Sequence, residues 1–211
     1  MTLNSKYSYW YFKNVLTEKF CDDVIKRGNS EKESLALTGD FEHKDPEALS
    51  NKDYNDLKKL RNSRIAWLND HWIYAHIHPY LKEANKNAGW NYQWDYSEAC
   101  QFTKYKLNQY YGWHKDDWEK AYENSNNLNY NGKVRKLSIS VQLSDCSEYE
   151  GGELEFQPRD VQDPNHTIAC TEAQTKGSII IFPSYVWHRV KPVTKGTRYS
   201  LVIWNLGRPY M

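Results

Sequence analysis

Long hydrophobic runs are missing from this chain of 211 residues. No apolar stretch approaches the roughly 18 residues that a membrane-spanning helix requires. The first residues, MTLNSKYSYWYF, contain neither the basic start nor the apolar segment that is typical of a signal peptide. The sequence therefore predicts a protein that has no membrane partner.

A surplus of one charge is missing as well. The chain has 28 Lys and Arg residues against 27 Asp and Glu residues, which gives a formal net charge of +1. Such a balance produces no broad electric field that would draw the protein to nucleic acid or to a charged membrane. We therefore do not expect nucleic acid as a partner.

Paired cysteines are the third absence. The four cysteines, Cys21, Cys100, Cys146 and Cys170, are scattered along the chain. Their spacing fits neither a disulfide framework nor a zinc site. We interpret them as reduced thiols, which indicates a cytoplasmic location.

Three helices are predicted, all in the N-terminal part of the chain. The first has Thr17 as its N-cap, a stripe of apolar residues, and Gly28 at its end. The third begins after Asp70, and Pro79 should kink or split it. The three helices span residues 17–28, 53–62 and 70–87.

Strands dominate the remainder, and aromatic residues make up 15% of the chain. Residues 136–143 alternate apolar and polar side chains, which is typical of a half-buried strand. Residues 148–156 enter a strand through the turn Gly151-Gly152. Further strands are predicted at 8–14, 64–68, 90–96, 99–107, 167–170, 177–182, 187–193 and 198–204.

Many short strands that follow N-terminal helices predict an α+β fold. The expected architecture is a β-sandwich or jelly roll with helices packed outside. No internal repeat or long linker is visible, so we expect a single domain over 1–211. Within it, 1–98 would supply a helical buttress and the first strands, and 99–205 the jelly-roll core.

The segment GWHKDDW at 112–118 carries the first chemical signal. On an extended strand, residues two apart share a face, so His114 and Asp116 would point the same way. A histidine and a carboxylate are two of the three ligands in the facial triad of non-haem iron oxygenases. Asp117 would point to the opposite face. The alternative is a surface strand whose two polar side chains are solvated.

His188 is the candidate for the third ligand. It lies more than seventy residues beyond the first pair, but a jelly roll can make distant strands neighbours. Two imidazoles and one carboxylate leave three positions open on iron. These positions suffice for a bidentate 2-oxo acid and for dioxygen.

A dicarboxylate co-substrate would also need a cation, and Arg198 is the candidate. A guanidinium can hold a carboxylate with two charge-assisted hydrogen bonds. Ser200, two residues further on, would lie on the same strand face and could donate to the same carboxylate. The alternative is that Arg198 is an exposed residue paired with an acid.

A second histidine pair and a long loop are also visible in the sequence. His76 and His78 lie two apart within a predicted helix and so do not share a face, which argues against a metal site there. The long, asparagine-rich loop 117–134 is predicted to act as a lid, because long loops in compact domains are often functional. The nearby aromatic residues that could line a substrate groove are Tyr111, Trp113, Trp118 and Trp204.

Taken together, these motifs resemble the iron(II)- and 2-oxoglutarate-dependent dioxygenases, and within them the PKHD-type and prolyl 4-hydroxylase-like hydroxylases. The resemblance covers about half of the chain. It rests on KYKLNQYYGWHKD (104–116), LSISVQLSDCSEYEGGELEF (137–156) and GSIIIFPSYVWHRVKPVTKGTRYSLVIW (177–204). It implies a double-stranded β-helix, or jelly roll, with the N-terminal helices packed against the major sheet.

The resemblance also implies roles for particular residues. His114, Asp116 and His188 match the iron ligands, and Arg198 matches the 2-oxoglutarate anchor. Tyr105 matches a tyrosine that hydrogen-bonds the co-substrate, with a core tyrosine as the alternative. Gln142 is a weaker match to a pocket residue, and it completes the set of positions carried over.

The implied activity is hydroxylation of a prolyl or related residue in a peptide, or of a small molecule. Dioxygen would be consumed, succinate and CO2 would be released, and ascorbate is considered as an additional cofactor. Two alternatives stay open at this point. One is oxidative demethylation of nucleic acid, and the other is a non-catalytic jelly-roll module that only binds metal.

Overall fold

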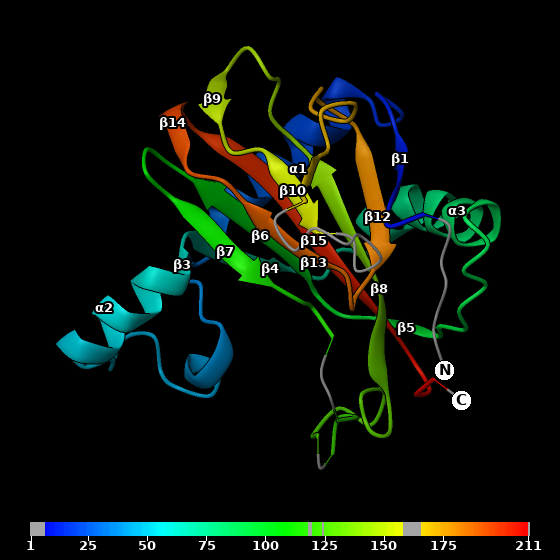
Figure 1. Cartoon of the computed structure of the whole chain (residues 1–211), viewed down its shortest axis with the longest axis horizontal. Helices are drawn as coiled ribbons and strands as arrows, with labels where there is room; N and C mark the ends of the chain where they lie inside the picture. Colours follow the sequence, from blue (N-terminus) through cyan, green and yellow to red (C-terminus); the bar gives the residue numbers. More distant parts are fainter. Residues whose placement is uncertain (1–6, 118–119, 124, 158–165, 211) are drawn as a thin grey trace.

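The computed structural model describes residues 7–117, 120–123, 125–157 and 166–210, and it shows two facing β-sheets with helices packed outside them (Figure 1). The larger sheet has eight strands in the order β1-β12-β8-β15-β6-β4-β2, with β5 paired to β15. Its strands are β1 (Trp10–Phe12), β2 (Ser34–Leu35), β4 (Arg64–Leu68), β5 (Tyr96–Ser97), β6 (Cys100–Tyr105), β8 (Val134–Gln142), β12 (Ile179–Pro183) and β15 (Arg198–Gly207).

The smaller sheet has five strands in the order β11-β10-β13-β7-β3, and a separate pair joins β14 to β9. All strand pairs whose register is known are antiparallel. The strands are β3 (Arg61–Asn62), β7 (Tyr110–His114), β9 (Tyr149–Gly151), β10 (Leu154–Gln157), β11 (Ile168–Ala169), β13 (Trp187–Val190) and β14 (Val193–Gly196). The two facing sheets remain open, and they give the jelly-roll arrangement that the sequence predicted.

Two of the helices cover the outer face of the larger sheet. They are α1 (Glu18–Ser30) and α3 (His71–Asn87), and their apolar stripes pack with the outward-facing side chains of β6, β8, β12 and β15. A second apolar cluster, which includes Phe156 and Phe182, lies between the sheets. The prediction that N-terminal helices pack against the major sheet is therefore confirmed.

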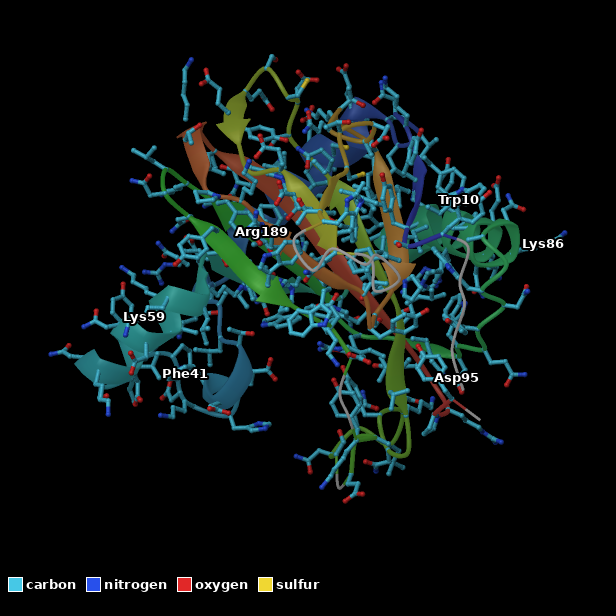
Figure 2. All side chains as sticks on the ribbon, in the orientation of Figure 1. Trp10, Phe41, Lys59, Lys86, Asp95 and Arg189 are labelled. Carbon is cyan, nitrogen blue, oxygen red and sulfur yellow. The ribbon has the colours of Figure 1, made fainter. Side chains whose placement is uncertain are left out.

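The third helix lies apart from this core. It is α2 (Asn51–Leu60), and it follows the short 3₁₀ turn η1 (Gly39–Phe41). Figure 2 shows Lys59 of α2 and Phe41 of η1 on the arm of the molecule that projects beside the smaller sheet. No helix within the described residues is long and apolar enough to cross a membrane.

The predicted end of the first helix was wrong, although its start was right. The Thr17 side chain accepts a hydrogen bond from the backbone N–H of Phe20, as an N-cap does. The helix continues past Gly28 to Ser30. Gly28 is needed for packing, because a Cβ atom there would lie 2.3 Å from the ring of Phe102 on β6.

Three other local predictions need correction. Residues 90–95 are irregular, and of the expected strand 90–96 only Tyr96 is in a strand, the two-residue β5 (Tyr96–Ser97). Helix α3 runs unbroken through Pro79. Strand β8 is buried on both faces and not half-buried, because its polar side chains point between the sheets; Ser138, for example, lies 2.9 Å from the hydroxyl of Ser184.

Candidate metal and co-substrate site

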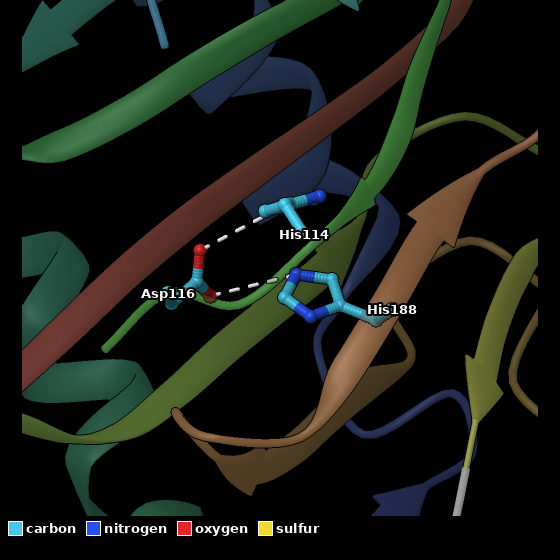
Figure 3. A group of neighbouring side chains, drawn as sticks. All are labelled: His114, Asp116 and His188. Carbon is cyan, nitrogen blue, oxygen red and sulfur yellow. Dashed lines mark ion pairs between the residues drawn. The ribbon is translucent and has the colours of Figure 1, made fainter. Parts of the chain in front are cut away.

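His114, Asp116 and His188 meet between the sheets (Figure 3). His114 ends β7 and is directly opposite His188 on β13, so the strand pairing brings the two imidazoles together. Asp116 follows two residues after β7 ends. Its two oxygens lie 3.7 Å from Nε2 of His114 and 3.6 Å from Nε2 of His188. One ligand atom from each residue lies within 4.8 Å of the other two.

Backbone carbonyls orient both imidazoles. Nδ1 of His114 lies 2.8 Å from the carbonyl oxygen of Gly112, and Nδ1 of His188 lies 2.9 Å from that of Val186. A carbonyl can only accept, so Nδ1 carries the proton in each ring. Each Nε2 is thereby left with a free lone pair that faces the carboxylate, as a metal ligand requires.

The turn after β7 brings Asp116, and not Asp117, into the cluster. The backbone N–H groups of both aspartates donate to the carbonyl oxygen of Ser184. The Asp116 side chain is buried, and its Oδ2 has no hydrogen-bond partner among the described residues. Asp117 instead lies 3.4 Å from the ammonium group of Lys115. This is the choice between the two aspartates that strand alternation favoured.

The electrostatics of the cluster favour a neutral imidazole beside a charged carboxylate. Burial and the neighbouring His188 hold the pKa of His114 well below its usual value. Burial alone would raise the pKa of Asp116, but His188, His114 and Arg135 together bring it below its usual value. Both shifts favour the protonation states in which these groups bind a cation.

Arg198, Ser200 and Tyr105 line a cavity of about 40 Å³ that the histidines and Asp116 also line. Arg198 is directly opposite Tyr105 on the paired strands β15 and β6. The Arg198 side chain is only 3% exposed, and its Nη1 has no hydrogen-bond partner among the described residues. The alternative that Arg198 is an exposed residue paired with an acid is therefore wrong.

The Gln142 side chain lies among other residues than those of the cavity that Arg198 lines. Its Nε2 donates to the carbonyl oxygen of Ser144 and to the hydroxyl of Tyr149, at 3.1 and 2.8 Å. It is not among the residues that line the cavity. Gly151 and Gly152 both have positive φ values, and Gly152 passes close to the Arg198 side chain, where a Cβ atom would lie 3.0 Å from Cδ.

An open groove of about 600 Å³ reaches His114 and Asp116. Of the aromatic residues expected to line a substrate groove, Tyr111, Trp113 and Trp204 do so, while Trp118 lies outside the described residues. Trp67 and Trp187 were not anticipated. A segment from the N-terminal part of the chain also lines the groove, with residues Leu35, Leu37, Thr38, Gly39, Glu42 and Pro46.

The predicted lid 117–134 contributes little to the lining of the groove in the part that the structure describes. Of those residues only Asp117 lines the groove. The loop folds back on itself, with the N–H of Tyr122 donating to the carbonyl of Lys133, and Nδ2 of Asn127 donates to the Tyr96 hydroxyl. The segment around Thr38 lines the groove, and the role of loop 117–134 as a lid stays a prediction.

Arg61 is the residue in the site that sequence reasoning missed. It forms β3 with Asn62, pairs with Tyr111 on β7, and lines both the groove and the cavity. Its guanidinium lies 4.3 Å from the centre of the Tyr111 ring, which in turn stacks on His114. The polar run RNSR offered no strand signal, and the residue was assigned to the preceding helix.

The remaining histidines and cysteines lie elsewhere. His76 contacts the carbonyl oxygen of Trp72, and His78 contacts the hydroxyl of Ser97. Cys21, Cys100 and Cys170 are buried free thiols, while Cys146 is exposed. Within the described part of the chain, the only grouping of three potential metal-ligating side chains is the one formed by His114, Asp116 and His188.

Curated relatives align with about half of the chain. A PKHD-type hydroxylase of Idiomarina loihiensis is 34% identical over 102 residues, which cover 48% of this chain and 39% of the relative. The PKHD-type hydroxylase YbiX of Escherichia coli O157:H7 is 33% identical over 104 residues, which cover 49% and 40%. The chain thus matches only about two fifths of the length of these relatives.

Solved structures resemble the whole fold. A viral collagen prolyl hydroxylase of Paramecium Bursaria Chlorella virus-1 has a TM-score of 0.62 at 18% identity, covering 97% of this chain and 99% of that chain. A prolyl hydroxylase of Trichoplax adhaerens has a TM-score of 0.62 at 16% identity, covering 95% and 84%. The family model described as the 2OG-Fe(II) oxygenase superfamily matches residues 100–205, half of the sequence. The chain therefore belongs to the 2OG-Fe(II) oxygenase superfamily.

Proposed function

We propose that this protein is an iron(II)- and 2-oxoglutarate-dependent dioxygenase that hydroxylates a prolyl or related residue in a peptide, or a small molecule. The observation that carries the proposal is the convergence of two features in one cavity. Three potential ligand side chains, His114, Asp116 and His188, meet there. The buried Arg198, whose Nη1 has no hydrogen-bond partner among the described residues, lines the same space.

The residues present fit the metal. Two bare Nε2 atoms and one carboxylate are the donor set of the facial triad that holds iron(II) in oxygenases. The partnerless Oδ2 of Asp116 is a second sign, because a buried carboxylate oxygen without a donor is costly unless a cation satisfies it. In the proposal, His114, Asp116 and His188 hold the iron.

The residues also fit a dicarboxylate. In the proposal Arg198 binds the carboxylate of 2-oxoglutarate that is remote from the metal, and the hydroxyls of Ser200 and Tyr105 donate hydrogen bonds in the same cavity. A buried arginine with an unsatisfied N–H would destabilise the fold, and a bound anion removes that cost. The strand pair β6 and β15 fixes all three side chains.

Iron(II) with 2-oxoglutarate and dioxygen supplies an oxidant that hydroxylates a C–H bond and releases succinate and CO2. The protein orients the three ligand side chains, through the carbonyl oxygens of Gly112 and Val186 for the histidines. Apolar side chains of Leu154, Phe182 and Val190 line the cavity and limit the access of water.

The substrate is proposed from the groove and from the relatives. The groove has a volume of about 600 Å³, is lined by tryptophans, and is suited to a peptide segment or to a small molecule that packs against aromatic rings. The Trichoplax relative is described in complex with a peptide fragment, which favours the peptide. Ascorbate belongs to the proposal as a reductant that keeps iron in the iron(II) state. We also propose that residues 1–211 form a single domain. The buried free thiols favour a cytoplasmic location.

Succinate formation tests the proposal. The purified chain is incubated with iron(II), 2-oxoglutarate and dioxygen, with and without a panel of prolyl peptides and small molecules. We expect iron-dependent succinate that increases with a suitable substrate and disappears in His114→Ala. Absence of succinate under all conditions, together with unchanged iron binding in His114→Ala, would support the non-catalytic alternative.

A further inference from the structure

Arg61 has more hydrogen-bonding capacity than the protein uses. It is 3% exposed. Its Nε donates to the Ser63 hydroxyl at 3.0 Å, and its Nη1 donates to the carbonyl oxygen of Leu37 at 3.4 Å. Its Nη2 is buried and has no hydrogen-bond partner among the described residues. An arginine is always charged, so this guanidinium is a buried cation with an unsatisfied donor.

The position of Arg61 is fixed next to the metal cluster. The pairing of β3 with β7 places it directly opposite Tyr111, whose ring separates it from His114. The Tyr111 hydroxyl is held in turn by Thr38 at 2.6 Å. Arg61 lines both the groove and the small cavity, and His114 and Asp116 line both as well, so Arg61 lies where the groove meets the proposed metal site.

No carboxylate among the described residues forms an ion pair with Arg61. Of the carboxylates that line the groove, Asp117 pairs with Lys115, and Asp116 faces the two histidines. Glu42 also lines the groove; burial raises the pKa of its carboxyl, although the charges of Arg135 and Arg61 act to lower it, and no ion pair joins Glu42 to Arg61. The other groove arginine, Arg135, is already held by Glu98 through two hydrogen bonds of 2.7 and 2.8 Å.

A second buried donor lies in the same place. Nε1 of Trp204 has no hydrogen-bond partner among the described residues, and Trp204 lines both the groove and the cavity. Two unsatisfied donors, one of them cationic, indicate a ligand with acceptor oxygens and negative charge. Arg198 lies on the same strand as Trp204, directly opposite Tyr105, and lines the small cavity but not the groove.

We propose that Arg61 binds a carboxylate of the primary substrate and so makes the enzyme selective for acidic substrates. This inference rests on the proposed function, because it assigns a substrate class to the same site. Arg61 is a specificity-determining residue: it holds the acidic group of the substrate near the Tyr111 ring while a C–H bond of the substrate faces the metal. The carboxylate belongs either to a small molecule or to an acidic side chain of a peptide.

Matched pairs of acid and amide probes test the proposal. The full chain is first loaded with Mn(II) and 2-oxoglutarate, and loading is measured by calorimetry. Mn(II) replaces iron(II) so that the substrate binds without being turned over. N-acetyl-L-proline and its amide are then titrated, followed by the blocked dipeptides Pro-Asp and Pro-Asn. The first pair represents a small-molecule carboxylate and the second a peptide side chain. Tryptophan fluorescence of the groove reports binding.

We expect the wild type to bind at least one acid more tightly than its amide, on the order of tenfold to a hundredfold. Arg61→Gln should abolish the preference and leave Mn(II) and 2-oxoglutarate loading intact. Arg61→Lys, which keeps the charge but not the planar fork, should retain part of it. Arg64→Gln is the matched control, because Arg64 is an exposed arginine three residues away on β4, and it should retain all of it.

Equal binding of acids and amides by the wild type would overturn the proposal, and this comparison needs no variant to fold. Failure of every acid to bind at millimolar concentration, or a preference that persists in Arg61→Gln, would overturn it too. Failure of the wild type to load Mn(II) and 2-oxoglutarate would overturn the proposed function itself. The loading step, which precedes the probes, keeps these two failures distinguishable.

Discussion

His114 and His188 are paired residues on adjacent antiparallel strands, with ring centroids 4.1 Å apart. They are more than seventy residues apart in the sequence. The pairing of β7 with β13 therefore builds two thirds of the triad from backbone hydrogen bonds alone. Asp116 needs only the turn after β7 to complete it, because Ser184 holds the backbone of that turn.

Asp116→Ala should abolish tight metal binding, whereas Asp117→Ala should retain it. Asp116 faces both histidines, while Asp117 faces Lys115. Loss of a residue that only hydrogen-bonds a metal ligand weakens metal affinity by about tenfold to a hundredfold. Loss of a ligand itself should therefore weaken metal affinity by at least about a hundredfold. Calorimetric titration with Mn(II) measures the difference. Equal metal affinity in the two variants would contradict the assignment.

Arg198→Gln should raise the concentration of 2-oxoglutarate needed for half-saturation and spare metal binding. The lost interaction is a charge-assisted carboxylate contact, so the expected increase is roughly tenfold to a hundredfold. Arg189→Gln is a suitable control, because Arg189 lies on β13 and pairs with Glu155 on its outer side. An unchanged 2-oxoglutarate affinity in Arg198→Gln would show that the anchor lies elsewhere.

Gly28→Ala should destabilise the protein by about 1–3 kcal/mol. The added Cβ would overlap the ring of Phe102, which is itself buried and stacked on Tyr199. The higher helix propensity of alanine offsets only part of this cost. Denaturant unfolding measures the change, with Asn29→Ala as an exposed control in the same helix. A stability equal to or above wild type would show that helix α1 can shift away from β6.

Lys136→Met should stabilise the protein below pH 8. The Lys136 side chain is 4% exposed and packs over the Tyr210 ring, and it forms no ion pair with a carboxylate among the described residues. Burial lowers its pKa to about 8 from an ordinary 10.5. Below pH 8 the folded protein holds a buried charge, and removing that charge should add about 1–2 kcal/mol, because the aromatic rings compensate for part of the desolvation.

The pH dependence of that difference follows from the sign of the shift. A lowered pKa in the folded state contributes stability that is complete above pH 10.5 and lost as the pH falls through 8. The advantage of Lys136→Met should therefore shrink between pH 8 and 10.5. A difference between variant and wild type that stays constant across this range would show that lost packing, and not the charge, determines the effect.

Local patterns predicted most of the strands, and the two-residue spacing of Arg198 and Ser200 places both on β15, but Asp116 reaches its position through the turn after β7 and not through strand alternation. The same patterns failed where a side chain faces the space between the sheets. Ser138 and Ser140 alternate with apolar residues as surface residues do, yet both are buried. Arg61 was missed because a two-residue strand pair leaves no periodic signal, and only the pairing with Tyr111 places it beside the site.

The central claim is that His114, Asp116 and His188 hold iron(II) in the same cavity in which Arg198 holds 2-oxoglutarate. The most direct test is an anaerobic titration of 2-oxoglutarate into the iron(II)-loaded protein, followed by visible absorption. A chelating 2-oxo acid on iron(II) produces a charge-transfer band, and we predict a saturable band that is absent in Asp116→Ala and shifted to higher 2-oxoglutarate concentration in Arg198→Gln. Tightly bound iron that gives no band at millimolar 2-oxoglutarate would contradict the account.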